Sequence, residues 1–407
     1  MKRVVITGMA IASPLGSTLK TAYDRLQLLE NCIKKDDKLD EYENLYTKLC
    51  ARVEGFKIPD NFTRKVTRTM GPVSVLSCAT VQDALIDAGL INDSIIQNGD
   101  TAVCYGSSSG SLDAIIDFYS FCIEKKFRSL NSGSYIKMMP QTTAVNISLL
   151  FKTTGRLVTT STACTSGSMA IGNGYELIKN GVQKIAITGG AEEMHVSHIG
   201  VFDTLYATST KNSTPKLTPS PFDKDRDGLV IGEGAGTLIL EEYEHAKARG
   251  AKIYAEVIGF ATNTDGTHIT NPNSETMAKV MEESLKSASL TKNEIGYINA
   301  HGTGTISGDI AESKATEKIL GCNIPVSTIK SYTGHTLGAC GAIEAILSIE
   351  MMNNNWFCPN LNLVNLDENC APLNYITNSG INKEAEFIIS NNFAFGGINT
   401  SLIFKRV

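Results

Sequence analysis

The chain has 407 residues, of which 42% are hydrophobic, and this length suits two or three globular domains of ordinary size. Its net charge is −5, from 37 Lys and Arg against 42 Asp and Glu, so it lacks the basic excess that a nucleic-acid-binding face requires. No apolar run approaches the roughly 18 residues of a transmembrane helix, so we expect no membrane span.

The ten cysteines are scattered along the chain without a CxxC pair or a regular spacing. This distribution is unlike a zinc site or a secreted disulfide framework, so we expect a cytoplasmic protein. The first residues, MKRVVITGMAIASPLG, imitate a secretory signal with its cleavage site. A buried strand is the better interpretation, because Val4, Val5 and Ile6 are β-branched and Gly8 interrupts the apolar run early.

Strands and helices alternate along the chain, a pattern that predicts a layered, largely parallel α/β architecture. In the first half, an apolar run at 101–106 precedes a strand at 157–164. A helix of small residues then extends to about Lys179, Gly181 ends it, and the strand KIAITGG follows.

The second half repeats this order. The run IGYINAHG is followed by PVSTIKSYTGH, a helix through GAIEAILSIEMM, an Asn-rich stop and the strand FIISNNFAFGG. This internal repeat predicts two halves, which we place at residues 1–252 and 253–407.

Each half brings a reactive side chain to a strand end or a helix start, where sites gather in open α/β sheets. Cys164 lies in VTTSTACTSGS, and His301 and His335 lie in the second half. Near a helix N-terminus, unsatisfied backbone N–H groups stabilise a thiolate, so the pKa of a thiol there is expected to lie below the free value of about 8.5. We therefore expect Cys164 to be a nucleophile, although a buried structural cysteine is the alternative.

Four blocks carry a resemblance to a known family: TACTSGS, HGTGT, STIKSYTGHTLGACGAIEA and NNFAFGG. In this order they resemble the β-ketoacyl-acyl carrier protein synthases of the thiolase fold, type II in particular. Residues 220–256 are similar to the central region of that family, so the resemblance spans the whole chain. It implies an α/β, thiolase-like fold of two pseudo-symmetric halves in a five-layered α-β-α-β-α architecture.

The segments YIKMMPQTTAVN and SNNFAFGG look closest to the synthases of aryl polyene pathways. The implied reaction is a decarboxylative Claisen condensation of an acyl thioester with malonyl-acyl carrier protein, in the synthesis of an aryl polyene or related polyene lipid. Housekeeping fatty acid elongation is the alternative. No cofactor or metal is implied, because 4'-phosphopantetheine arrives on the carrier protein. The acyl carrier protein is the expected partner, and a homodimer or a heterodimer with a chain-length-factor-like subunit is the expected assembly.

The resemblance also implies roles for single residues. Cys164 carries the acyl group, and His301 and His335 stabilise the enolate that decarboxylation produces. Lys330 tunes the local field and pairs with Glu344 or Glu312. The N–H groups of Cys164 and Phe395 form the oxyanion hole, with Phe395 also a gate, and the pantetheine contacts are Thr303, Thr305 and Thr270.

Two positions depart from the usual pattern of these relatives. Ala394 replaces a common glycine, and because alanine disfavours positive φ we expect a narrower swing of the loop that carries Phe395. Ser109 replaces a bulkier apolar residue of relatives that handle saturated chains, so we expect it to line the floor of the acyl pocket. A helix-capping role for Ser109 is the alternative.

Two basic clusters stand out in this acidic chain. They are Arg64, Lys65 and Arg68 in NFTRKVTRTM, and Lys125, Lys126 and Arg128 in EKKFR. Carrier proteins are strongly acidic, so we expect these clusters to guide docking, although solvated charged faces are the alternative.

Some segments also match the patterns of other kinds of functional site. Ser108 lies in a GxSxG context that is typical of a hydrolase nucleophile elbow. His195 and His198, after Glu192 and Glu193, imitate metal ligands but lack further ligands at suitable spacing. The GEGAG segment precedes a strand, whereas a dinucleotide site needs a helix there. A non-catalytic subunit of the chain-length-factor type would usually lack the cysteine that this chain retains.

Overall fold

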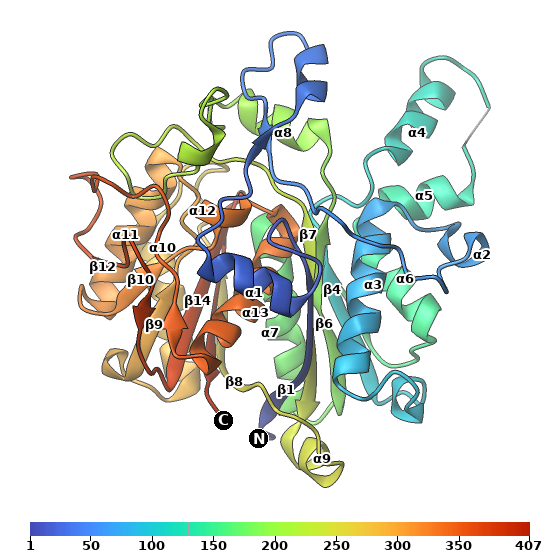
Figure 1. Cartoon of the computed structure of the whole chain (residues 1–407). Coiled ribbons are helices and arrows are strands. Elements are labelled where there is room, and N and C mark those ends of the chain that lie inside the picture. The colour runs from blue at the N-terminus through green and yellow to red at the C-terminus, as the bar shows by residue number, and fades with distance from the viewer. Residues whose placement is uncertain (128–129) are drawn as a thin grey trace.

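The structure, a computed structural model, describes residues 1–127 and 130–407, so Arg128 lies outside the described residues (Figure 1). Eleven strands of the described chain form one sheet in the order β12-β10-β9-β14-β15-β8-β1-β7-β6-β4-β5. They are β1 (Val4–Ala12), β4 (Thr101–Gly106), β5 (Leu157–Thr160), β6 (Ile185–Glu192), β7 (Gly234–Glu242), β8 (Ala255–Thr264), β9 (Ile295–Asn299), β10 (Pro325–Ser327), β12 (Asn374–Tyr375), β14 (Phe387–Ala394) and β15 (Ile398–Lys405). Two small two-stranded sheets lie apart, formed by β2 (Lys34–Lys35) with β3 (Leu49–Cys50) and by β11 (Trp356–Phe357) with β13 (Ile381–Asn382).

The strand β1 joins the two halves of this sheet. It pairs along its length with β7 and, through Val4, Val5 and Ile6, also with β8. Every residue of β1 is buried, so the interpretation of the first residues as a buried strand is confirmed. The boundary expected after residue 252 falls between the helix that ends at Ala248 and the strand that begins at Ala255.

Helices complete five layers (Figure 1). Helices α3 and α6 cover the outer face of the first half-sheet, α7 and α13 lie between the half-sheets, and α10 and α11 cover the outer face of the second. The expected thiolase-like layering is therefore confirmed. The helices are α1 (Leu19–Gln27), α2 (Arg64–Thr67), α3 (Pro72–Asp87), α4 (Ala114–Cys122), α5 (Ser132–Met138), α6 (Thr142–Phe151), α7 (Ser166–Lys179), α8 (Val196–Asp203), α9 (Tyr243–Ala248), α10 (Ser274–Ala288), α11 (Ile306–Leu320), α12 (Lys330–Thr333) and α13 (Cys340–Asn353).

The central helix α7 needs its small residues because both half-sheets press on it. A Cβ added to Gly172 would lie 2.2 Å from the ring of Phe260, and one added to Gly174 would lie 2.4 Å from a methyl of Thr188. Such distances leave no room for a side chain, so the glycines permit the close packing that buries α7.

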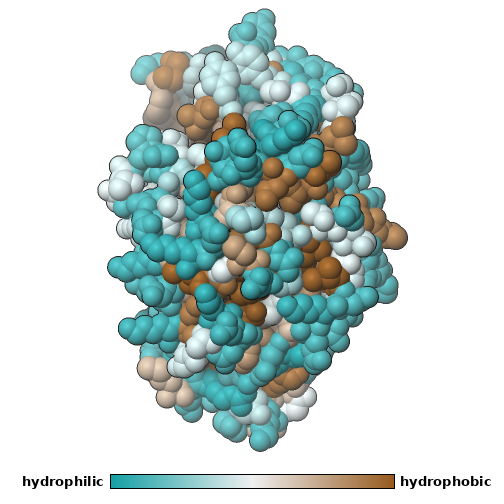
Figure 2. Space-filling view, turned by 90° about the vertical axis from the view of Figure 1, so that its left-hand side faces the viewer, coloured by the Kyte–Doolittle hydropathy of each residue, from teal (hydrophilic) through white to brown (hydrophobic). Residues whose placement is uncertain are grey.

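The surface differs between the layers. Figure 2 shows the side that faces left in Figure 1, where hydrophilic side chains predominate and hydrophobic ones form separate patches. Exposed hydrophobic residues also occur on α4, where Ile116 is 61% and Tyr119 55% exposed. Within the described ranges, no helix is both long and apolar enough to cross a membrane.

Candidate active site

Cys164 lies in a sharp turn between β5 and α7. The preceding residue, Ala163, has a φ of +50°, a left-handed conformation that is rare for alanine and marks local strain. Ser166 holds this turn, because its hydroxyl donates to the Ala163 carbonyl at 2.7 Å and accepts the N–H of Thr162 at 3.0 Å. The turn places Cys164 directly before the N-terminus of α7.

The second half contains a matching turn. Leu337, with a φ of +47°, lies in the short 3-10 turn before α13, and the two turns pack against each other. The thiol of Cys340, at the start of α13, donates to the carbonyl of Cys164 at 3.1 Å. The internal repeat thus brings both turns to one site.

His335 contacts the thiol directly. Its Nε2 lies 2.9 Å from Cys164 Sγ, and its Nδ1 accepts the N–H of Leu337 at 3.2 Å. Because a neutral imidazole that accepts at Nδ1 carries its proton on Nε2, His335 presents an N–H to the sulfur.

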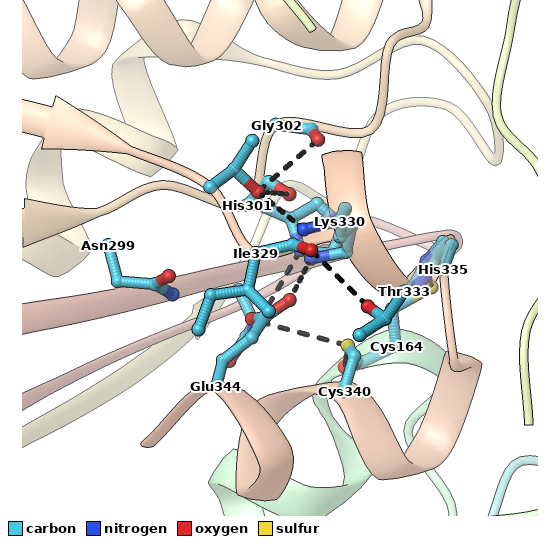
Figure 3. A network of polar contacts seen from close by, with 12 residues as sticks. Cys164, Asn299, His301, Gly302, Ile329, Lys330, Thr333, His335, Cys340 and Glu344 are labelled. Atoms are coloured by element: carbon cyan, nitrogen blue, oxygen red, sulfur yellow. Dashed lines mark hydrogen bonds and ion pairs between the residues drawn. The ribbon is translucent and has the colours of Figure 1, made fainter. Parts of the chain in front are cut away.

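His301 is oriented in the same manner by Lys330 (Figure 3). The Lys330 ammonium lies 3.0 Å from His301 Nδ1, and an ammonium can only donate. Nδ1 must therefore accept, which leaves the proton on Nε2. The His301 and His335 rings are nearly perpendicular, at 87°, with centroids 5.2 Å apart.

The Lys330 side chain is buried, with 1% exposure, and pairs with the carboxylate of Glu344. The other carboxylate oxygen of Glu344 accepts from Asn392 at 2.7 Å. Burial alone would lower the pKa of Lys330, but the Glu344 carboxylate, together with Cys340 and Glu312, outweighs burial, and the pKa lies above its usual value. The ammonium therefore stays charged at neutral pH.

Glu312 has a different role from Glu344. Its two oxygens accept the backbone N–H groups of His301 at 2.6 Å and Gly302 at 2.7 Å. Of the two expected partners of Lys330, Glu344 makes the ion pair and Glu312 fixes the backbone on which His301 is held.

The pKa values of the site correct one expectation. Burial raises the pKa of the Cys164 thiol to about 11, although Lys330 and the N–H groups of Phe395 and Cys164 oppose this shift. A thiolate favoured below the ordinary pKa was expected, and this prediction is wrong because desolvation exceeds the effect of the helix terminus. Burial, followed by the charge of Lys330, lowers the pKa of His301 and His335 well below the usual value.

Two cavities meet at Cys164. The larger, of about 280 Å³, is lined by His301 and His335 and also by the three expected pantetheine contacts, Thr270, Thr303 and Thr305. The smaller, of about 160 Å³, is lined by His198, Val201 and Leu337 among others. Cys164, Phe202 and Phe395 line both cavities.

The ring of Phe395 stacks on that of Phe202 with centroids 4.8 Å apart, where the two cavities adjoin. Ala394 lies inside β14, paired with Ile398, and its φ is not positive. This conformation suits alanine, and the narrower swing expected of the loop that carries Phe395 stays a prediction. The left-handed positions are Gly396, with a φ of +84°, and Gly397, with a φ of +70°.

The serines after β4 form contacts that the sequence did not indicate. The Ser108 hydroxyl donates to Glu192 at 2.5 Å, and no histidine of the described chain bonds to it, so the hydrolase alternative lacks its base. Ser109 Oγ lies 2.9 Å from His198 Nε2. Ser109 does not itself line the smaller cavity, whereas its partner His198 does.

His198 is a site residue that sequence reasoning missed. His198, Val201 and Phe202 occupy positions i, i+3 and i+4 of α8, so they share one helix face, and this spacing was the available signal. His195, by contrast, lies 3.3 Å from Asp113 and caps α8. The two groups with metal-ligand spacing in the described chain are Cys164, His301 and His335, and His301, Cys340 and Glu344, so neither includes His195 or His198.

The expected docking residues lie apart from the larger cavity. Arg64, Lys65 and Arg68, on and after α2, are exposed and make no ion pair with another described residue. Figure 1 shows α2 at the opposite side of the molecule from α10 and α11. Lys125 and Lys126 follow α4, and Lys126 pairs with Glu124 at 3.2 Å.

Comparisons with known proteins agree with this geometry. The sequence profiles described as Beta-ketoacyl synthase, N-terminal and C-terminal domains, match residues 1–246 and 254–364. A 3-oxoacyl-[acyl-carrier-protein] synthase 2 of Vibrio cholerae is 37% identical, covering 100% of this chain and 99% of the relative.

Solved structures give the same result. A beta-ketoacyl synthase from Burkholderia phymatum is 52% identical with a TM-score of 0.98, covering 100% of both chains. A ketosynthase solved in complex with its chain length factor, from Xenorhabdus doucetiae, is 26% identical with a TM-score of 0.85, covering 100% of this chain and 98% of that one.

The raised pKa of Cys164 predicts how its alkylation depends on pH. Because only the thiolate reacts, the rate with iodoacetamide should keep rising from pH 7 to pH 10, by about tenfold per unit, whereas a free thiol levels off near its pKa of about 8.5. Peptide mass spectrometry measures the rate at Cys164, with glutathione as the reference thiol. A plateau of the rate at or below pH 8.5 would show that the pKa of the Cys164 thiol is not raised.

Proposed function

Because the chain belongs to the beta-ketoacyl synthase family, we propose that its Cys164 carries an acyl group during a decarboxylative Claisen condensation. The chain is an acyl-transferring condensing enzyme, a 3-oxoacyl-acyl carrier protein synthase whose substrates arrive on the prosthetic group of the carrier protein. The observation that carries the residue assignment is the pair of neutral imidazoles whose Nε2–H groups are oriented by Lys330 and Leu337.

In the first step, Cys164 Sγ attacks the carbonyl of an acyl thioester in the larger cavity. A bond forms between sulfur and the acyl carbon, the bond to the pantetheine sulfur breaks, and the thiol proton passes to the leaving thiolate. The backbone N–H groups of Phe395 and Cys164 face Sγ, where they would stabilise the oxyanion. The free thiol pKa of about 11 is compatible with this step, since the Nε2–H of His335 donates to the sulfur as its proton leaves.

In the second step, a malonyl thioester occupies the larger cavity. The Nε2–H groups of His301 and His335 donate to its thioester oxygen, where negative charge gathers as the bond to the carboxylate breaks and carbon dioxide leaves. The enolate carbon then attacks the acyl carbonyl on Cys164, which releases the thiolate and the 3-oxoacyl product. Lowered pKa values suit this role, because neutral imidazoles keep the tautomers that Lys330 and Leu337 impose.

Variants of Cys164 and of the two histidines test this assignment. Intact mass after incubation with an acyl-carrier protein should rise by one acyl group, and Cys164→Ala should abolish the rise. Alanine at His301 or His335 should slow the release of carbon dioxide from malonyl-carrier protein, because it should raise the activation barrier by about 3 to 5 kcal/mol. A mass shift that persists in Cys164→Ala, or release at the wild-type rate in the double histidine variant, would refute it.

For the finer substrate class, we propose a conjugated acyl chain of an aryl polyene or related polyene lipid, with housekeeping fatty acid elongation as the alternative. The proposal is supported by the resemblance of residues 135–146 and 390–397 to aryl polyene synthases. A second support is the small polar side chain at Ser109, next to the smaller cavity. A conjugated chain loses less flexibility on binding than a saturated chain does. A saturated chain instead depends on apolar walls, from which it gains about 0.8 kcal/mol for each buried methylene.

A competition assay tests the substrate class. With saturated and polyunsaturated acyl-carrier proteins of equal length, Ser109→Ile should lose the polyunsaturated substrate first, because it fills space and removes the hydroxyl. Ser109→Ala removes only the hydroxyl and separates the two effects. An equal loss of both substrates in Ser109→Ile would show that Ser109 does not determine the preference between saturated and polyunsaturated chains.

We also propose that the protein acts as a dimer. The strand β5 forms one edge of the sheet and α4 exposes Ile116 and Tyr119, two features typical of an interface. A second copy is the proposed partner, and a chain-length-factor-like subunit is the alternative.

Ten free cysteines support a reducing, cytoplasmic location.

We propose that docking of the carrier protein at Arg64, Lys65, Arg68, Lys125 and Lys126 depends on this dimer, because α2 lies on the opposite side of one chain from α10 and α11, which contribute to the wall of the larger cavity (Figure 1). The sixth residue expected in this set, Arg128, lies outside the described residues. Carrier proteins are acidic, so the exposed Arg64, Lys65 and Arg68, which form no ion pair with another described residue, would speed their approach.

Charge reversal tests the docking surface. Arg64→Glu with Arg68→Glu should raise the Michaelis constant for the carrier protein, most at low salt, because exposed charges are screened as salt increases. Lys279→Glu with Lys314→Glu, on α10 and α11, is the matched control. An unchanged constant at every salt concentration would exclude this surface.

A further inference from the structure

Arg226 is a buried cation that the proposed reaction does not use. It lies in the segment between the short 3-10 turn Pro215–Leu217 and β7, and its side chain is 1% exposed. A charged group that is removed from water must be paired and hydrogen-bonded, or it destabilises the fold. The partners of Arg226 therefore indicate the role of this charge.

Two carboxylates pair with the Arg226 guanidinium. Its Nε lies 3.4 Å from Asp309 on α11, and its Nη1 lies 2.8 Å from Asp367. Nη1 also donates to the carbonyl of Asp223 at 2.7 Å. These contacts hold the cation where three segments that are distant in the sequence meet.

Other contacts of Arg226 reach the loop that follows β9. Nε donates to the carbonyl of Thr305 at 3.3 Å, and Nη2 donates to the carbonyl of Ile306 at 3.0 Å. Asp309 adds to this anchor, because it accepts the N–H of Gly304 at 3.2 Å. The guanidinium presents its donors in a rigid planar fork, which a lysine ammonium cannot reproduce. Arg226 and Asp309 thus fix the second part of the loop.

The first part of the same loop is held separately. Glu312 accepts the N–H groups of His301 and Gly302, so the backbone at His301 does not depend on Arg226. Asp309 and Glu312 occupy positions i and i+3 of α11, which brings both carboxylates to the same side of the helix. The loop therefore has two anchors, one for the imidazole of the proposed reaction and one for the residues that follow it.

Thr303 and Thr305 are the side chains that depend on the second anchor. Both residues are half-buried and line the larger cavity, and their Oγ1 atoms lie 2.9 Å apart. This contact uses one of the two O–H groups and leaves the other for a ligand in the cavity. The pantetheine arm carries amide carbonyl groups, which accept such a hydrogen bond.

We propose that Arg226 is a positioning residue for the pantetheine arm. By holding the backbone at Thr305, it keeps the hydroxyls of Thr303 and Thr305 at the wall of the larger cavity, where the arm binds. Arg226 then contributes to binding of the arm and leaves the chemistry at Cys164 and the two histidines unchanged. This inference rests on the proposed function, in which thioesters of pantetheine enter the larger cavity.

A truncated thioester tests this inference. Release of carbon dioxide is measured with malonyl-pantetheine and with malonyl ethyl thioester, which has the same reacting atoms but no amide. Arg226→Lys keeps the charge next to Asp309 and loses the fork, so kcat/KM for malonyl-pantetheine should fall by about tenfold, the value of one hydrogen bond, mainly through KM. With the ethyl thioester, kcat/KM should stay at the wild-type value.

Arg249→Lys is the matched control. Arg249 is also an arginine with a forked ion pair, to Glu241, and a hydrogen bond to a backbone carbonyl, but it lines neither cavity. This variant should keep both wild-type values. Valine at both Thr303 and Thr305 should reproduce the selective loss, and adding Arg226→Lys to that double variant should cause no further loss.

Thermal unfolding shows whether each variant is folded. If Arg226→Lys does not fold, Asp309→Asn takes its place, because it weakens the same anchor and keeps an amide oxygen as acceptor. The inference is overturned by an equal loss with both thioesters, by no loss with either, or by equal kcat/KM values for the two thioesters in the wild type. If the wild type releases carbon dioxide from neither thioester, the proposed function itself fails.

Discussion

The ion pair between Lys330 and Glu344 is the interaction on which the rest of the site depends. Both side chains are almost fully buried, and removing either would leave an unpaired charge in the core. The ammonium occupies His301 Nδ1 and so decides which nitrogen of that ring carries the proton. It also opposes the rise in the pKa of Cys164. One buried cation thus sets the hydrogen-bonding direction of His301 and opposes the loss of acidity that burial imposes on Cys164.

The two halves of the chain contribute unlike chemistry through like geometry. Each half has a left-handed residue, Ala163 or Leu337, in a turn that starts a central helix. The first turn exposes a thiol, whereas the second supplies the N–H that orients His335. Glu192 connects them, because it accepts from Ser108 in one half and from Gly338 in the other. The repeat therefore does more than fill space, since the site exists only where the two turns meet.

Much of the fold was predictable because its signals are local. Alternating strands and helices and the repeated order of segments indicated two halves, and the structure has the expected five layers. Cys164, His301, His335 and Lys330 were found because their segments have distinctive residue patterns. The raised pKa of Cys164 was not predictable, since desolvation depends on packing from both halves.

Contacts between distant segments were also beyond reach of the sequence. The bond between Ser109 and His198 joins residues 89 positions apart, so neither segment alone reveals it. The pairing of Ala394 with Ile398, which places Ala394 at the end of β14, was likewise not visible in the sequence. The choice of Glu344 over Glu312 as the partner of Lys330 likewise needed the positions of α13 and α11.

The stacked rings of Phe202 and Phe395 have a consequence for the order of events. They stand where the two cavities adjoin, and Cys164 is reached from both. An acyl group that passes into the smaller cavity leaves the larger one vacant, and the two histidines there become accessible to the next thioester. Under the proposed function, the larger cavity can then serve both substrates in turn, and the first carrier protein has to depart before the second binds. The division of the site into two cavities therefore leads to double-displacement kinetics.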